Sequence, residues 1–190
     1  MKTLFLIDGN ALIHRAYHAI QPMFASSGLQ TNAVYGFTSM MLNILEMEHP
    51  DYIAIAFDHK GKTFRHESMD TYKATRKKME DPLREQIEYV HRIADSFNIP
   101  KFVIPGYEAD DTLVTIAKRV ANPDLKVVIV TGDMDILQVV EGNIFVHTLH
   151  KGYREHAVYN SQAVFEKYGI EPKQVPDYKG LAGDSSDNLK

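Results

Sequence analysis

The stretch Thr3-Leu4-Phe5-Leu6-Ile7-Asp8-Gly9-Asn10 joins a short apolar run to an acidic turn, and the same arrangement returns twice along the chain. Tyr52–Phe57 is followed by Asp58, and Lys126–Val130 is followed by Thr131-Gly132-Asp133. Apolar runs of this length, bounded by turn residues, are typical of strands buried in a parallel sheet. Ligands of open α/β sheets bind beyond the carboxyl ends of the strands. The three aspartates are therefore expected along one rim of a sheet.

Apolar runs and helical patterns alternate through the rest of the chain, which predicts an α/β fold with a mostly parallel central sheet flanked by helices. The other strand candidates are Lys101–Ile104, Ile144–His147 and His156–Tyr159. Helical patterns cover Ala33–Glu48, Leu83–Phe97, Asp110–Val120 and Ser161–Tyr168.

Composition restricts the class of protein. The chain has 190 residues, 44% of them hydrophobic and 24% charged, which is ordinary for a globular domain with a sizeable core. It has no cysteine, so disulfides and thiolate-bound zinc are excluded. The only continuous apolar run near the N-terminus, Leu4–Ile7, is too short for a signal peptide or a membrane span. A cytoplasmic protein is expected.

Nine carboxylates gather in five short clusters. They are Asp8; Asp58; Glu108, Asp110 and Asp111; Asp133 and Asp135; and Asp184 and Asp187. A single aspartate after a strand is usually a helix cap or a turn residue, and acids in a first helical turn complement the helix dipole. So many acids at one site, however, require cations, because each charge disfavours ionisation of the next. Oxygen ligands suit Mg²⁺ or Mn²⁺, and such sites commonly act on phosphate esters.

The formal net charge of −4 hides a division between acidic and basic parts of the chain. Without the nine clustered acids, 16 acids remain against 21 Lys and Arg. Residues 60–84 alone hold eight Lys or Arg against four acids. A basic tract beside an acidic metal centre suits binding and cutting of a polyanion, although charge alone is more typical of a solvated loop.

The ordered set of motifs resembles the 5′-nuclease family, which comprises the 5′→3′ exonuclease domain of bacterial DNA polymerase I and the flap endonucleases, with a PIN-like fold. The matching motifs are Leu6-Ile7-Asp8-Gly9-Asn10, Arg15-Ala16-Tyr17-His18-Ala19, Thr31-Asn32-Ala33-Val34-Tyr35-Gly36-Phe37, Ala56-Phe57-Asp58, Phe64-Arg65, Tyr72-Lys73-Ala74-Thr75-Arg76, Gly106-Tyr107-Glu108-Ala109-Asp110-Asp111, Thr131-Gly132-Asp133 with Asp135, and Gly183-Asp184 with Asp187-Asn188. Each motif is weak alone, but together they run in order from residue 3 to the end of the chain.

The resemblance implies that all nine carboxylates serve two or more Mg²⁺ or Mn²⁺ ions. Asp8, Asp58, Glu108, Asp110 and Asp111 would form the tighter site, and Asp133, Asp135, Asp184 and Asp187 would complete the set, some through water. Ions of this kind lower the pKa of water and stabilise the leaving oxygen of a phosphodiester.

The resemblance also implies a helical gateway over the metals, made by Tyr72-Lys73-Ala74-Thr75-Arg76, whose Lys73 and Arg76 would offset charge on the scissile phosphate. An exposed pair that only solubilises a helix is the alternative. The expected DNA contacts are Arg15, Tyr17, His18, Tyr35, Arg65, Tyr72 and Lys77. Tyr17 and Tyr35 could stack on bases or pack in the core.

The implied activity is metal-dependent 5′→3′ exonuclease and 5′-flap endonuclease cleavage. The implied partners are DNA with a 5′ flap, a nick or a single-stranded 5′ end, an RNA primer in an RNA–DNA hybrid, and a DNA polymerase, fused or separate. The expected domains are a catalytic core over residues 1–170 and, over 171–190, the start of a duplex-binding helix-hairpin-helix-like region that the family continues past this point. The chain is expected to be a fragment or a naturally short protein.

Two alternatives carry distinct signals. A phosphatase of the haloacid dehalogenase type needs a second aspartate two residues after the first, and Asn10 stands there instead. A shortened relative that binds branched DNA without cutting it would fit the missing C-terminal region. The intact acids argue against that reading, because unused buried carboxylates destabilise a fold.

Overall fold

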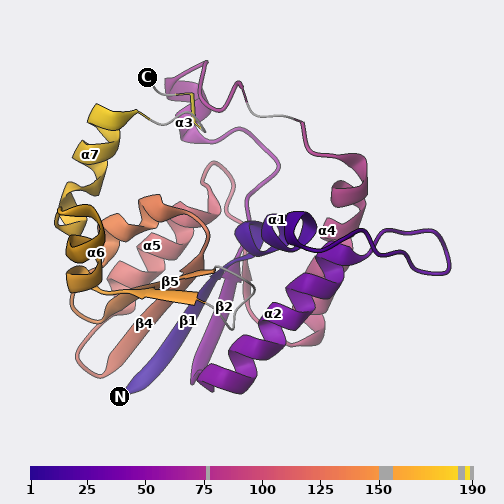
Figure 1. The fold of residues 1–190 in the computed structure, drawn as a ribbon, viewed down its shortest axis with the longest axis horizontal. Helices are drawn as coiled ribbons and strands as arrows, with labels where there is room; N and C mark the ends of the chain where they lie inside the picture. The colour runs from indigo at the N-terminus through magenta and orange to yellow at the C-terminus, as the bar shows by residue number, and fades with distance from the viewer. Residues whose placement is uncertain (76–77, 150–155, 184–186, 189–190) are drawn as a thin grey trace.

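The computed structural model describes residues 1–75, 78–149, 156–183 and 187–188, and it shows a six-stranded sheet between two layers of helices (Figure 1). The strands are β1 (Lys2–Asp8), β2 (Tyr52–Ala56), β3 (Lys101–Phe102), β4 (Leu125–Thr131), β5 (Ile144–Leu149) and β6 (His156–Tyr159). Their order across the sheet is β3-β2-β1-β4-β5-β6, and only the pairing of β6 with β5 is antiparallel. The expected α/β fold with a mostly parallel sheet is confirmed.

Successive side chains of a strand point to opposite faces of the sheet, so a hydrophobic core forms on each face. On β1, Phe5 and Ile7 face the layer made by α1 (Gly9–Ala19), α2 (Asn32–Glu48) and α4 (Asp81–Ser96). Leu6 faces the opposite layer, made by α5 (Ala109–Val120), α6 (Ser161–Tyr168) and α7 (Val175–Ala182) with the short helices η1 (Met134–Val139) and η2 (Pro172–Gln174). Both faces of the central strands are thereby buried, as the continuous apolar runs require.

The four expected helices are present, with ends shifted by no more than two residues. Three further helices, α1, α3 (Phe64–Ser68) and α7, were not expected from the hydrophobic pattern. α1 starts directly after β1, and the side chain of Asp8 caps it. Gly9 is required at this junction, since a Cβ there would lie 2.2 Å from the Phe57 ring.

The gateway segment differs from the expectation. Within the described part of the motif, residues 72–75, the chain forms successive turns and no helix. Lys73 has φ 56°, a left-handed conformation that a right-handed helix excludes. The backbone N–H of Lys73 instead donates to the carbonyl of Asp187 at 3.3 Å, so a tertiary contact replaces the helical one.

α3 and the turns that follow it lie above the carboxyl ends of β1, β2 and β4 (Figure 1), and the turns contact Asp187 and Asn188. This placement closes one side of the rim on which the sequence predicts a site. Among the residues described, no helix combines the length and the apolar character needed to cross a membrane.

Candidate metal centre at the carboxyl rim of the sheet

Asp8 is the central acid of the rim. It ends β1 and is 5% exposed. One carboxylate oxygen accepts from the backbone N–H of Ala11 at 2.9 Å, and the other accepts from the hydroxyl of Thr131, at the end of β4, at 2.7 Å. Burial raises the pKa of Asp8 to about 6, and the charges of Asp58 and Asp133 add to the rise, while these two hydrogen bonds lower it. The side chain is fixed between two strands with its charge only partly compensated.

Asp58 follows β2 and is held from both sides. Its Oδ1 accepts from the backbone N–H of Ala109 at 2.8 Å, at the positive end of α5, and its Oδ2 accepts from Nδ2 of Asn10 at 3.1 Å. The Oδ1 of Asn10 in turn accepts from the backbone N–H of Asp58 at 3.1 Å. Asn10 therefore orients Asp58, a role that the sequence did not indicate.

Asp110 carries the clearest sign that a cation belongs here. Its Oδ1 is buried and has no hydrogen-bond partner among the described residues. Burial is the main cause that raises the pKa of Asp110 to about 9. The negative charges of four neighbouring carboxylates contribute to the same rise, in the order Asp8, Asp133, Asp58 and Glu108. A buried, unpartnered carboxylate oxygen among like charges is costly unless a positive ion pairs with it. Four further carboxylates lie around it, and oxygen ligands are those that Mg²⁺ and Mn²⁺ prefer.

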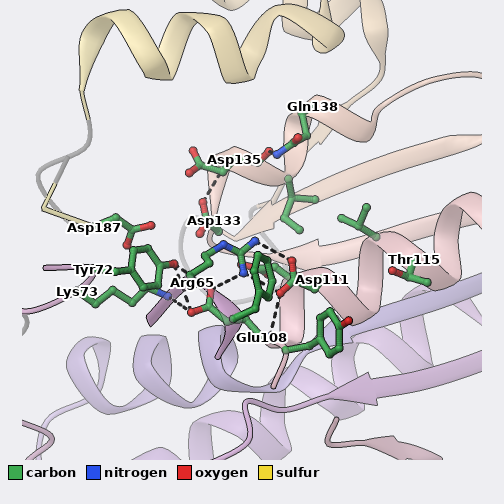
Figure 2. A pocket seen from close by; sticks show the side chains of 15 residues that line it. Arg65, Tyr72, Lys73, Glu108, Asp111, Thr115, Asp133, Asp135, Gln138 and Asp187 are labelled. Carbon is green, nitrogen blue, oxygen red and sulfur yellow. Dashed lines mark hydrogen bonds and ion pairs between the residues drawn. The ribbon is translucent and has the colours of Figure 1, made fainter. Parts of the chain in front are cut away.

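Two basic side chains, Arg65 and Lys73, lie against Glu108 and Asp111 at the start of α5 (Figure 2). Arg65, on α3, donates to both oxygens of Asp111, each at 2.7 Å, and its Nη1 lies 3.5 Å from Glu108. Lys73 donates to Glu108 at 2.7 Å, and the Tyr72 hydroxyl lies 3.1 Å from the same carboxylate. Burial opposes ionisation of Asp111, but hydrogen bonds from Arg65 and the Glu108 backbone hold its pKa below the ordinary value.

The late acids lie on the same rim. Asp133 follows β4 and caps η1 by accepting from the backbone N–H of Asp135 at 2.8 Å. Asp135 pairs with Lys179 of α7 at 2.8 Å. Asp187 lines the cavity together with both of them (Figure 2), so the described part of the C-terminal motif reaches the site. Asp184 lies outside the described residues.

The described acids line two adjoining cavities. The smaller, about 190 Å³, is bordered by Asp8, Asp58, Glu108, Asp110 and Asp133. The larger, about 370 Å³, is bordered by Glu108, Asp110, Asp111, Asp133, Asp135 and Asp187, together with Arg65, Tyr72 and Lys73. Lys73, Glu108, Asp110 and Asp133 border both cavities. Asp133 borders the smaller cavity and Asp111 borders only the larger one, and the division of the acids between metal ions stays a prediction.

The residues that the sequence predicts to contact DNA lie in different parts of the structure. Arg65, Tyr72 and Lys73 lie at the acids. Arg15, Tyr17 and His18 lie on α1, where the Tyr17 hydroxyl donates to Glu80 at 2.8 Å, and Tyr17 and His18 border a separate cavity with Glu80. Tyr35 is 56% exposed. Arg76 and Lys77 lie outside the described residues.

Three site residues escaped the sequence analysis. Asn10 and Thr131 position Asp58 and Asp8, and His14 borders the smaller cavity one helical turn after Asn10. Asn10 and Thr131 each lie two residues from an acid at a strand end, Asp8 and Asp133, and stand in the quoted motifs, whereas His14 lies six residues after Asp8. The motifs could have indicated the first two, and the sequence has no comparable signal for His14.

Comparison with known proteins identifies the class. The family described as "5'-3' exonuclease, N-terminal resolvase-like domain" matches residues 3–169. DNA polymerase I of Caldicellulosiruptor bescii is 43% identical over 98% of this chain, which spans 22% of that protein. The 5'-3' exonuclease of Aquifex aeolicus is 37% identical over 100% of this chain, which spans 64% of that protein. The D15 protein of T5, co-crystallised with metal ions, has the same fold, with a TM-score of 0.72 at 24% identity, over 98% of this chain and 68% of that one.

The α/β fold of the chain is thus shared with this solved structure. The chain belongs to the 5'-3' exonuclease N-terminal domain family, since the match covers most of its length. Because the chain belongs to this family, the alternative that it is a phosphatase of the haloacid dehalogenase type is excluded. The chain spans about a fifth of the length of its polymerase relatives.

Proposed function

We propose that the chain is a divalent-metal-dependent 5′-nuclease that hydrolyses phosphodiesters of DNA. The unpartnered, buried Oδ1 of Asp110, surrounded by four further carboxylates at the carboxyl rim, is the observation that supports this best. Asp8, Asp58, Glu108, Asp110, Asp111, Asp133, Asp135, Asp184 and Asp187 would hold two or more Mg²⁺ or Mn²⁺ ions. When bound, such ions supply a water of lowered pKa and charge stabilisation at phosphorus.

The chain's own residues then have separate tasks. Asp8 and Asp58 are fixed by hydrogen bonds from Thr131, Ala11, Asn10 and the start of α5, so they present oxygens at constant positions. Such preorganised ligands need no rearrangement when charge develops.

Lys73 and Arg65 hold positive charge beside Glu108 and Asp111 on the wall of the larger cavity (Figure 2). We assign them to the phosphate, because both now neutralise Glu108 and Asp111, and a bound cation would take over that neutralisation. Arg76 would join them, as the family motif implies. Released from the acids, Lys73 and Arg65 can offset charge on the phosphoryl oxygens.

The proposed substrates are duplexes with a 5′ flap, a nick or a single-stranded 5′ end, including an RNA primer on DNA. A DNA polymerase, fused or separate, is the proposed partner, because the polymerase relatives carry this domain in one longer chain. The proposed location follows from that role: the cytoplasm, at the nucleoid.

The test is cleavage of a 5′-labelled flap duplex by this 190-residue chain with Mg²⁺, Mn²⁺ or EDTA. We expect cuts near the junction with either metal and none with EDTA. A parallel duplex with RNA at the 5′ end tests primer removal. DNA binding without hydrolysis at any metal concentration, in a preparation shown to be folded, would overturn the enzyme assignment in favour of a non-cutting binding relative.

A further inference from the structure

A second group of metal-ligating side chains lies away from the acidic rim. Glu48, the last residue of α2, meets His147 of β5 and His156 of β6, and one ligand atom from each lies within 4.8 Å of the other two. The members are 99 and nine residues apart in sequence. No sequence spacing could therefore have indicated this group.

The antiparallel register explains why the two histidines meet. His147 pairs with Val158, and Leu149 pairs with His156, so the histidines are diagonal neighbours on one face of the β5–β6 hairpin. Their rings stack with centroids 4.6 Å apart and planes inclined by 18°. The face is the one that Phe5 and Leu149 share with α2, and the ring of His147 also meets Phe5 edge-on.

Glu48 completes the group from the helix side. The Nε2 of His156 lies 3.9 Å from the Oε1 of Glu48, and the side chains of these two residues are 15% and 26% exposed. His147 is 4% exposed. The group is thus sheltered on the protein side and open to solvent at one edge, where a further ligand such as water can enter.

We propose that Glu48, His147 and His156 form a binding site for a divalent transition metal, with Zn²⁺ as the best fit. Two imidazoles and one carboxylate are the ligand set of several zinc sites, which leave a fourth position for water. Ligand atoms around tetrahedral zinc lie about 3.3 Å apart, given bonds of about 2.0–2.1 Å. The 3.9 Å contact must therefore shorten by about half an ångström, and the other two separations, which are within 4.8 Å, by up to about 1.5 Å, through rotation of the partly exposed Glu48 and His156 side chains.

The chemistry of the donors separates this site from the acidic rim. Imidazole favours Zn²⁺, Co²⁺ and Ni²⁺, whereas Mg²⁺ binds oxygen ligands and retains water. The rim offers carboxylate oxygens, so an excess of Mg²⁺ occupies the rim and leaves the histidine site to the transition metal.

The site would connect the end of α2 to β6, the edge strand of the sheet. A metal held only by the folded chain stabilises it by mass action. Zinc binding should accordingly raise the melting temperature without taking part in cleavage.

The test uses Co²⁺ as a spectroscopic substitute for Zn²⁺, added to the 190-residue chain in excess Mg²⁺. We expect one Co²⁺ per chain with the strong visible absorption of four- or five-coordinate cobalt, displaced by Zn²⁺. His156→Gln and Glu48→Gln should each weaken binding at least about tenfold, the loss seen even for groups that only support a ligand. His147→Gln should do the same where circular dichroism shows that it folds.

Two variants serve as controls. His49→Asn changes an exposed histidine next to Glu48 that is outside the group, at a left-handed position which asparagine tolerates. Asp110→Asn alters the acidic rim. Both should keep the cobalt spectrum and its affinity. A spectrum that persists in folded His156→Gln and Glu48→Gln, or only the weak absorption of six-coordinate cobalt in the unaltered chain, would overturn the proposal.

Discussion

Arg65 and Asp111 form a bidentate ion pair, with Nη1–Oδ2 and Nη2–Oδ1 distances of 2.7 Å each. One partner is a proposed DNA contact and the other a proposed metal ligand. Their pairing means that the carboxylate is neutralised by the protein's own cation when no ion or phosphate competes for it. Bidentate arginine–carboxylate pairs are among the stronger hydrogen-bonded contacts in proteins.

Arg65→Gln should therefore act in opposite directions on metal and on DNA. We expect tighter Mn²⁺ binding in the absence of DNA, because Asp111 loses its competing partner, together with weaker DNA binding and slower cleavage. Calorimetric Mn²⁺ titration and flap cleavage measure the two effects. Arg84→Gln, which removes an exposed arginine paired with Asp81, is the matched control and should change neither. Equal losses of metal and DNA binding would show that Arg65 only maintains the fold.

Lys73→Ala should lower the cleavage rate by about 10²–10³, the loss seen when one preorganised donor to a developing charge is removed. Lys73 lies 2.7 Å from Glu108 and borders both acid cavities. Single-turnover cleavage at saturating DNA separates this effect from binding. Lys78→Ala, at an exposed position five residues along the same basic tract, is the control. An unchanged rate for Lys73→Ala would assign the lysine to the solvated surface.

Asp111→Asn should abolish detectable cleavage while DNA binding stays equal or becomes tighter, since one negative charge facing the phosphates disappears. Asp111 also accepts from the Glu108 backbone at 3.0 Å, and asparagine oxygen can still accept there, so the fold should survive. Filter binding and cleavage on the same flap duplex check both outcomes. Cleavage at the unaltered rate would remove Asp111 from the metal site.

The stability of the metal-free chain should depend on pH through Asp8 and Asp110. Their pKa values in the fold, about 6 and about 9, lie above the ordinary value of 3.8, so the folded state holds protons that the unfolded state releases. The stability that these two groups contribute is complete below about pH 4 and falls as pH rises through 6 and then 9. Added Mg²⁺ should restore it at high pH.

Asp110→Asn isolates this effect. In EDTA at pH 9 the variant should melt at least about 2–4 °C above the unaltered chain, the shift that 1 kcal/mol produces at this size. The difference should shrink towards pH 5 and on addition of Mg²⁺ to the unaltered chain. Asp124→Asn, in an exposed turn, is the control for removing one negative charge. A variant that melts lower in EDTA at every pH would mean that Asp110 does not carry an uncompensated charge.

Gly9→Ala should destabilise the fold, because the added Cβ would lie 2.2 Å from the ring of Phe57, which is itself buried. Overpacking of this kind costs about 1–3 kcal/mol. Gly180→Ala is the matched control, since a Cβ there meets nothing within 4 Å and alanine favours the helix α7. Urea denaturation should show Gly9→Ala below and Gly180→Ala at or above the unaltered chain. Equal midpoints would contradict the tight contact.

How far the sequence predicts this structure depends on the range of the interactions. The six strands and the helices α2, α4, α5 and α6 follow from apolar runs and periodicity, which are local signals. α1 is missed because Asp8, Gly9 and Asn10 read as a turn, although Asp8 turns out to cap a helix. The gateway turns depend on contacts of Lys73 with Glu108 and Asp187, which are distant in sequence. The convergence of the acids follows from the strand ends, whereas the supporting roles of Asn10 and Thr131 require coordinates.

The central claim is that the acidic rim holds divalent metal ions, and anomalous diffraction from crystals grown with Mn²⁺ tests it most directly. We predict anomalous peaks within bonding distance of carboxylate oxygens, one of them at Oδ1 of Asp110, with Arg65 displaced from Asp111. Crystals of Asp110→Asn should lose that peak. A map of the unaltered chain without peaks among Asp8, Asp58, Glu108, Asp110 and Asp133, at Mn²⁺ concentrations that support cleavage, would contradict the account.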